Sequence, residues 1–340
     1  MSRVSNLLCR ASALALLLAA ACRDEAPLPS QPGDEILTEQ TPEPEQPPAP
    51  EPPPVPAPEP TAADVLDNRS DEPGLVFGSS GGVLNAYLNA VHTGWLNGGS
   101  ISPSNVLANL SAARAKGGRV VLKLCKGRDS FIKNSDGTFS LSKWKSLVSQ
   151  YRNVNLGPYI KDGTILGHYL IDEPHRAQRW GGKAISYSTL EEMAKYSKSI
   201  WPDLNTMIRV TPSWLAGASF TWKYVDAGWT QYRSTLGDAA RYVKAEAEAA
   251  RREGLGLVVG LNVLDGGNGS SNIRGYSSGK WAMSATEIRN YGSAMLSVTE
   301  ACGFFNWTWD DDYYTRSDIE KAMADVSALA RKHAKTSCRQ

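Results

Sequence analysis

Two periodicities alternate along the chain from about residue 74 onward. Short apolar runs rich in β-branched and aromatic residues predict buried strands, and they occupy Leu75–Gly78, Arg119–Cys125, Ile165–Ile171, Thr206–Val210, Tyr224–Gly228, Leu257–Leu261 and Phe304–Trp307. Apolar residues at helical spacing separate most of these runs, over Pro103–Lys116, Ser142–Tyr151, Ser188–Ile200, Thr235–Arg252, Ala285–Ala301 and Ser317–Ala334. Two of these helices begin with the spacing of a capping box, Ser188 with Glu191 and Ser284 with Glu287.

The alternation of strand and helix predicts a parallel sheet covered by helices. Seven strand candidates and a terminal helix predict an α/β fold, a (β/α)8 barrel of the TIM type, as a single domain over residues 74–336. One strand then escapes the pattern, within residues 80–100 or 152–163. A doubly wound open sheet is the alternative, but the glycine-rich segment Gly78–Gly82 lacks the lysine and the spacing of a phosphate-binding loop.

The first 21 residues have the pattern of a secretory signal. Arg3 and Arg10 precede a short apolar stretch, and small residues lead to Cys22. The small residues followed by cysteine resemble the lipobox of bacterial lipoproteins, although Ala19 stands where leucine is commoner. This resemblance implies that Cys22 is lipidated and anchors the chain to a membrane of the bacterial cell envelope, the outer membrane rather than the inner because Arg23 follows. Ordinary secretion is the alternative.

Residues 22–73 form a linker without the means to build a core. Of the 20 prolines, 14 lie between Asp24 and Ala62, together with nine acidic residues and neither lysine nor arginine. Such a segment is predicted to be disordered and extended. The composition therefore predicts a Pro/Glu-rich tether between the anchor and the barrel.

The composition of the remaining chain excludes several classes of protein. Residues 63–340 hold 33 basic and 26 acidic residues, a formal charge of +7 without any basic run, so no nucleic-acid partner is expected. Four histidines without regular spacing make a zinc enzyme improbable, and we expect neither a metal nor an organic cofactor. Of the cysteines, we expect Cys125 to be buried and unpaired, while a Cys302–Cys338 disulfide is open.

Polar residues gather at the carboxyl ends of the predicted strands, where β/α barrels carry their functional groups. Parity along a strand places alternate residues on one face. It favours Asp310 over Asp311 at the barrel mouth, on the face that Asn306 and Thr308 share. The residues expected at this end are Lys123, Asp172, Glu173, Arg209, Asp226, Trp229, Gln231, Asn262, Trp309 and Asp310. Lys123 lies within an apolar strand, and an ion pair with a carboxylate inside the barrel would offset the cost of its burial.

One of these strand ends resembles a known group. Gly167-His-Tyr-Leu-Ile-Asp-Glu-Pro174 is similar to the signature of TIM-barrel glycoside hydrolases, in which an Asn-Glu-Pro or Asp-Glu-Pro tripeptide carries the acid/base glutamate. The resemblance implies that Glu173 is the acid/base, that Asp172 orients the substrate, and that Asp310 is the second carboxylate. Two departures stand. The motif follows the third predicted strand rather than the fourth, and the last predicted strand offers aspartate where the family usually has glutamate.

The resulting hypothesis is a glycoside hydrolase that acts on a poly- or oligosaccharide through two carboxylates. A raised pKa of Glu173, through its neighbour Asp172, would suit the general acid. The expected substrate contacts come from Lys123, Arg209, Asp226, Trp229, Gln231, Asn262 and Trp309. The alternative is a non-catalytic glycan-binding lipoprotein with a degenerate glycosidase barrel, and the presence of a second carboxylate near Glu173 separates the two. Asp226 rather than Asp310 remains open as that partner.

Overall fold

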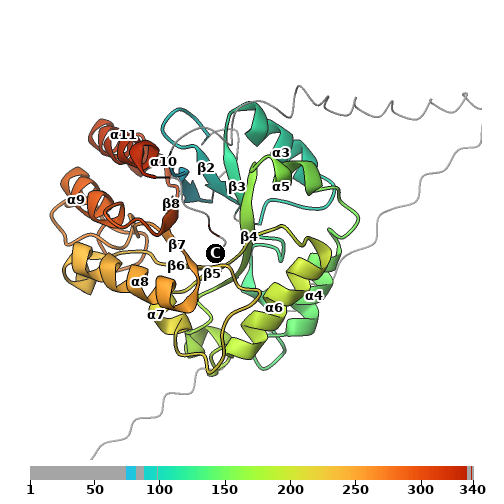
Figure 1. The fold of residues 1–340 in the computed structure, drawn as a ribbon. Helices are drawn as coiled ribbons and strands as arrows, with labels where there is room; N and C mark the ends of the chain where they lie inside the picture. The colour runs from blue at the N-terminus through green and yellow to red at the C-terminus, as the bar shows by residue number, and fades with distance from the viewer. Residues whose placement is uncertain (1–73, 82–87, 98, 335–337, 339–340) are drawn as a thin grey trace, which may run out of the picture. The chain divides into compact units, whose positions relative to one another are not determined.

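The computed structural model describes residues 74–81, 88–97, 99–334 and 338. The predicted leader, the lipid attachment at Cys22 and the tether lie outside these residues. The described chain forms a closed barrel of eight parallel strands, each paired with the next and the last paired with the first (Figure 1). The strands are β1 (Phe77–Ser80), β2 (Gly94–Leu96), β3 (Arg119–Leu122), β4 (Ile165–Asp172), β5 (Thr206–Arg209), β6 (Ala227–Trp229), β7 (Gly256–Val259) and β8 (Ala301–Asn306). The predicted (β/α)8 barrel is thus confirmed.

The strand that the sequence pattern did not mark is β2, within the predicted interval 80–100. Its three residues are too few for a period of two to be visible. Including β2 in the count moves the Asp172-Glu173-Pro174 motif to the end of the fourth strand, where the glycosidase resemblance expects it. The same count makes the last predicted strand the eighth, so Asp310 follows β8 and not the seventh strand.

Helices surround the barrel, as Figure 1 shows for the described chain. The longer helices agree with the predicted ones, and shorter ones follow several strands. The α-helices are α3 (Val106–Ala115), α4 (Leu141–Ser149), α5 (Gly157–Lys161), α6 (Tyr187–Ile200), α7 (Pro212–Leu215), α8 (Ala239–Glu253), α9 (Ala285–Met295), α10 (Asp311–Tyr314) and α11 (Ser317–Lys332), and single 3-10 turns are η1 (Asp129–Ile132), η2 (Ala177–Trp180) and η3 (Ser234–Leu236). In the part of the chain that the structure describes, no helix combines the length and apolar character needed to span a membrane.

One of the two predicted capping boxes forms. Ser284 and Glu287 bond to each other's backbone N–H groups at the start of α9. At the start of α6 the N-cap is Ser186 rather than Ser188, because the helix begins earlier than its sequence signal. Glu191 instead accepts hydrogen bonds from backbone N–H groups of the loop before β6, Lys223 among them at 2.7 Å. Glu191 therefore links α6 to the loop before β6 and does not form the predicted capping box.

Apolar side chains form two layers, one inside the barrel and one between the barrel and the helices. The inner layer includes Met207, Trp229, Val258 and Phe305. Since Phe305 points inward, its neighbour Asn306 faces outward, where its side-chain nitrogen lies 3.8 Å from the sulfur of Met323 on α11. The predicted inward face of this strand, built on Asn306, is therefore wrong. Aromatic bulk fills the barrel interior here, and the polar side chain finds partners outside.

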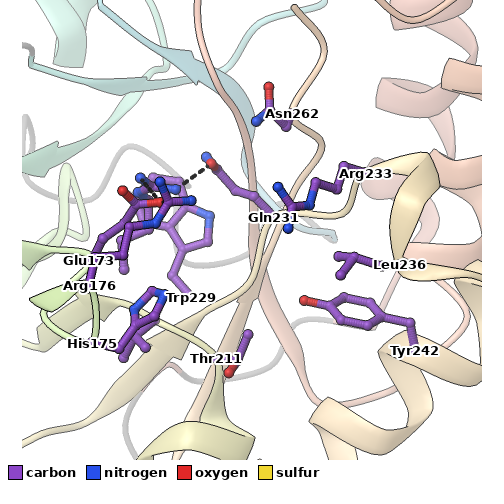
Figure 2. Close-up of a pocket in the computed structure, with 12 residues that line it drawn as sticks. Glu173, His175, Arg176, Thr211, Trp229, Gln231, Arg233, Leu236, Tyr242 and Asn262 are labelled. Atoms are coloured by element: carbon purple, nitrogen blue, oxygen red, sulfur yellow. Dashed lines mark hydrogen bonds and ion pairs between the residues drawn. The ribbon is translucent and has the colours of Figure 1, made fainter. Parts of the chain in front are cut away.

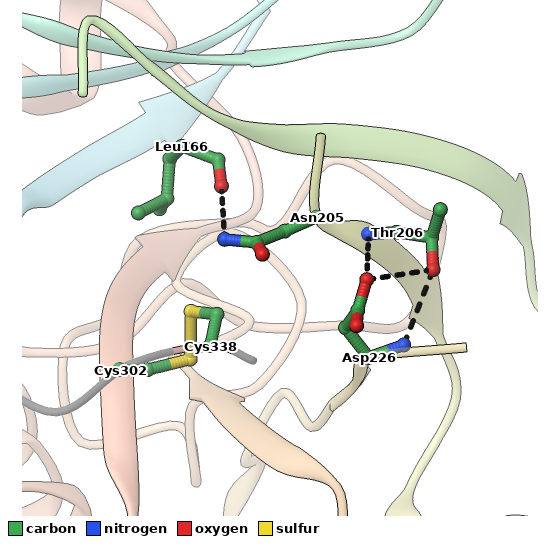
Figure 3. The surroundings of a disulfide bond; sticks show 6 residues. All are labelled: Leu166, Asn205, Thr206, Asp226, Cys302 and Cys338. Carbon is green, nitrogen blue, oxygen red and sulfur yellow. Dashed lines mark hydrogen bonds between the residues drawn. A yellow bond between two sulfur atoms is a disulfide. The ribbon is translucent and has the colours of Figure 1, made fainter. Parts of the chain in front are cut away.

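The amino end of the barrel is closed by covalent and ionic contacts. Cys302 and Cys338 form a disulfide with a Cα–Cα distance of 5.2 Å, which answers the open question of their pairing (Figure 3). Cys338 also packs against Gly256 at the start of β7, where a side chain on the glycine would meet the Cys338 backbone at 2.9 Å.

Cys125 is buried and free, as expected, and burial raises the pKa of its thiol to about 11.

Asp226 also lies at this end and not at the predicted carboxyl end. The strand begins at Ala227, three residues later than its apolar pattern suggests, so Asp226 precedes β6. Its carboxylate pairs with Lys198 Nζ at 2.6 Å and accepts the backbone N–H of Thr206 at 2.8 Å. Figure 3 shows Asp226 and Thr206 bonded to each other near the disulfide. The prediction that Asp226 contacts a ligand with Glu173 is therefore wrong, because the two residues occupy opposite ends of the barrel.

Candidate ligand-binding site

A pocket opens at the carboxyl end of the barrel, where strands β4 to β7 end (Figure 2). Its volume is about 210 Å³. Side chains from four successive strand ends and from α8 line it: Glu173, His175, Arg176, Arg209, Val210, Thr211, Trp229, Gln231, Arg233, Leu236, Tyr242 and Asn262. Glu173, Arg209, Trp229, Gln231 and Asn262 were all predicted from the sequence to lie at this end.

Glu173 is held by guanidinium groups on both of its carboxylate oxygens. Arg176 and Arg209 contact Oε1 at 2.9 and 3.1 Å, and Arg179 contacts Oε2 at 3.1 Å. The Glu173 side chain is 13% exposed, so these charge-assisted contacts are largely shielded from bulk water. Each oxygen therefore already accepts from a cation.

Asp172 shares the same arginines. Arg209 donates from Nε to one carboxylate oxygen, and Arg179 contacts the other at 2.7 Å. Burial alone would raise the pKa of Asp172, but the two guanidinium groups outweigh it and hold the pKa of this carboxyl well below its usual range. The same carboxylate helps to raise the pKa of Arg209 against the opposite effect of burial. Asp172 and Arg209 thus form a fixed ion pair at the base of the site.

The backbone explains how two adjacent carboxylates reach the same arginine. Side chains of neighbouring residues in a regular strand point to opposite faces. Glu173 has a φ of 45°, in the left-handed region that residues other than glycine rarely adopt. This conformation ends β4 and turns the side chain of Glu173 back beside that of Asp172, so both contact Arg209. An unfavourable backbone conformation kept at a strand end is a common feature of functional sites.

The environment of Glu173 differs from the one predicted for a general acid. The prediction relied on an apolar or like-charged setting, with Asp172 as the like charge. The structure instead places three arginines around Glu173, and two of them also contact Asp172. These contacts suit a carboxylate that accepts hydrogen bonds. A general acid must instead donate its own proton to the leaving group.

The second carboxylate expected near Glu173 does not line this pocket. Glu173 is the one acidic side chain among the described residues of the lining. The seventh strand, where the family resemblance expects the partner, leads into Asn262. Asp310 caps α10 by accepting from the Tyr313 N–H, and it lines a separate hollow with Asp312.

Two further predicted contacts lie elsewhere. Lys123 donates to the Gly127 carbonyl at 3.2 Å and lies 5.9 Å from the ring centroid of Tyr169. No carboxylate pairs with Lys123 among the ion pairs of the described chain, so the predicted ion pair is absent there. Trp309 stacks on Tyr314 with 4.3 Å between ring centroids, and its Nε1 donates to Asp311 at 2.8 Å. Packing within the protein therefore occupies one face of its indole.

Most of the cations of the site were not predicted from the sequence. Arg176 and Arg179 follow Glu173 on the same loop, three and six residues later, and this local spacing was a usable signal. Asp129 was not, because it reaches Arg179 from the loop after β3, at 2.6 Å. Arg233 enters the pocket from the segment after β6. In the described residues no group of three or more acidic, histidine or cysteine side chains is arranged to hold a metal ion.

Comparison with known proteins supports the barrel architecture. No protein-family model and no curated protein matches the chain. A β-glucanase from Saccharophagus degradans, solved with cellotetraose, superposes with a TM-score of 0.54 at 11% identity, over 76% of this chain and 89% of its own. A family 113 β-mannanase from Alicyclobacillus acidocaldarius superposes with a TM-score of 0.51 at 14% identity, over 76% and 98%. At such identities the likeness establishes the fold alone. The structural neighbours of this barrel are glycoside hydrolases that act on glycans.

Proposed function

We propose that the domain binds a carbohydrate in the pocket at the carboxyl end of its barrel and does so without cleaving it. The fold supports a carbohydrate ligand, because the neighbours of this barrel act on glycans and because β/α barrels carry their sites at this end. The observation that carries the proposal is that one acidic side chain, Glu173, stands among the described residues of the pocket lining, with a guanidinium on each of its oxygens. Most glycosidases need a second carboxylate on the opposite side of the bond.

The arginine cluster has a clear use in a binding site. Glu173 and Asp172 fix the side chains of Arg176, Arg179 and Arg209, and Arg209 in turn donates to Gln231 Oε1 at 2.8 Å. Side chains held in one geometry lose less conformational entropy when a ligand binds. The carboxylates of the tripeptide therefore serve to position hydrogen-bond donors.

Hydrolysis is the second candidate function. The specific observation in its favour is the position of the Asp172-Glu173-Pro174 motif at the end of β4, the strand that carries the acid/base in the resembled family. Cleavage at this site would require Arg176, whose side chain is 52% exposed, to move away from Glu173 when the ligand enters. It would also require water activation without the second carboxylate of the usual pair.

One experiment separates the two functions. The full chain and its Glu173→Gln variant are incubated with plant, bacterial and host glycans, with binding read on an array and products by mass spectrometry. Glu320→Gln on α11, an exposed glutamate, is the matched control. The proposal expects binding without products, with weaker binding in Glu173→Gln because its arginines are no longer fixed. Products that fall about 100-fold or more in Glu173→Gln alone would establish the hydrolase instead. No binding to any glycan would overturn the proposal.

A further inference from the structure

The hydrogen-bonding groups left free in the pocket are donors. Trp229 is 1% exposed, and its Nε1 has no hydrogen-bond partner in the part of the chain that the structure describes. The buried Nε2 of Gln231 is equally without one. A buried donor without an acceptor costs about 1–3 kcal/mol. Two such donors beside one pocket therefore favour a ligand that accepts hydrogen bonds.

Neighbouring contacts fix the orientation of the two amides in this pocket. Gln231 Oε1 accepts from Arg209 at 2.8 Å, so Nε2 is the end left for a ligand. Asn262 Oδ1 accepts the backbone N–H of Asp265 at 3.1 Å, which leaves its Nδ2 as the free end. In Figure 2 Gln231 and Asn262 lie on the same side of the pocket as Arg233. All three present N–H groups.

Three acceptors of the described pocket lining, two on Glu173 and one on Thr211, already have donors. Both oxygens of Glu173 accept from arginines. Thr211 Oγ1 accepts from the Ser213 hydroxyl at 3.0 Å and from the Trp214 N–H at 3.3 Å. Each hydroxyl of a neutral sugar donates as well as accepts, so a neutral sugar would compete with protein donors for these acceptors. An oxyanion accepts on every oxygen and needs no acceptor from the protein.

The charge of the lining also favours an anionic ligand. Three arginines and one glutamate line the pocket, and the surrounding ion cluster of Asp129, Asp172 and Glu173 with Arg176, Arg179 and Arg209 is balanced. Arg233 is outside that balance, because it forms no ion pair with any described residue. A guanidinium matches carboxylate, sulfate and phosphate geometry. Among the described residues of the lining, Arg233 is therefore the positive charge available to a ligand.

We propose that the ligand of this pocket is an anionic carbohydrate, whose carboxylate, sulfate or phosphate group binds Arg233 and the free donors of Trp229, Gln231 and Asn262. This inference rests on the proposed function and adds the chemical class of its ligand. The acidic group sits between the ends of β6 and β7, and the sugar ring faces Glu173 and His175. Neutral glycans of the same length bind more weakly because they leave Arg233 without an anion.

The test uses ligands matched in everything except charge. The full chain is titrated by calorimetry with trigalacturonate and with its methyl ester, with a sulfated galactan oligosaccharide and its desulfated product, and with inorganic sulfate and phosphate. The variants are Arg233→Gln and, as a control of equal charge change, Arg252→Gln at the exposed end of α8. The sugar carboxylate and the sulfate ester are thereby distinguished as sources of the anion.

The expected result is that a charged oligosaccharide binds more tightly than its neutral match. Arg233→Gln then loses roughly 10- to 100-fold in affinity for the charged form. Its affinity for the neutral form stays within about twofold of the wild type, and so does the affinity of Arg252→Gln for either form. Equal binding of charged and neutral forms, or an unaffected Arg233→Gln, would overturn the inference and leave the proposed function intact. Failure of every oligosaccharide to bind, charged or neutral, would overturn the proposed function as well.

Discussion

The two ends of the barrel both contain buried ion pairs, but the cluster at the carboxyl end lies beside a pocket whose lining includes unpartnered donors. At the amino end, Lys198 and Asp226 are each 8% exposed and pair at 2.6 Å, and the Asp226 carboxylate also accepts from the N–H and the hydroxyl of Thr206. At the carboxyl end, a larger cluster surrounds Glu173, and the donors of Trp229 and Gln231 beside it have no partner among the described residues. Burial of charge therefore does not mark the functional end. The free donors do.

The largest expected difference between the ends is the effect of charge removal on stability. Asp226→Asn leaves the ammonium of Lys198 buried without a counterion, which lowers the free energy of unfolding by about 3–5 kcal/mol. Arg233→Gln alters an exposed side chain and changes it by less than about 0.5 kcal/mol. Urea denaturation of both variants measures the contrast. Equal stability losses at the two ends would break the comparison.

The disulfide at the amino end gives the next effect. Cys302 and Cys338 are 36 residues apart, and a closed loop of that length corresponds to about 3–4 kcal/mol in the chain-entropy account. We expect Cys338→Ser to lose up to this amount and to keep ligand affinity. A reducing agent should lower the unfolding midpoint of the wild type and leave that of Cys338→Ser unchanged. A midpoint of the wild type that ignores reduction would contradict the assignment.

Acid sensitivity arises between the ends, in the layer around the barrel. Burial lowers the pKa of His168 to about 3 and that of His92 to about 4. The unfolded chain binds these protons near the ordinary pKa of 6.5, so stability is full above that value and falls as the pH drops towards 4. Between pH 7 and 5 each histidine accounts for about 2 kcal/mol.

His92→Phe tests the size of this effect. His92 stacks on Phe77 with 5.6 Å between ring centroids, and its Nδ1 has no partner among the described residues, so an apolar ring is tolerated there. The variant should lose about half of the pH dependence of the unfolding midpoint between pH 7 and 5. A slope as steep as that of the wild type would show that His92 is not the titrating group.

The sequence predicted the barrel because most of its strands are long enough to show an apolar pattern. It missed Gly94–Leu96 because three residues carry no period, and it misplaced Asp226 because the apolar run begins before the strand does. Five pocket residues were predicted from strand ends alone. The contact of Asp129 with Arg179 depends on two loops that meet only in the folded chain, and no local pattern encodes such a meeting.

Strand parity predicted the inward face of one strand correctly and that of another wrongly. It succeeded on β5, where Met207 fills the barrel and Arg209 continues on that face into the site. It failed on β8, where Phe305 rather than Asn306 fills the interior. Which of two adjacent residues on a strand faces the barrel depends on the space inside it. The sequence alone does not give the volume of that space.

The measurement that tests the central claim most directly is hydrogen exchange of the full chain with and without trigalacturonate, read by mass spectrometry. The account predicts slower exchange in the segments 172–180, 209–214, 229–236 and 260–266, and unchanged exchange in 198–206, where Lys198 and Thr206 contact Asp226. Protection confined to the amino end, or absent from the four segments while the ligand is bound, would contradict the assignment of the carboxyl end as the carbohydrate site.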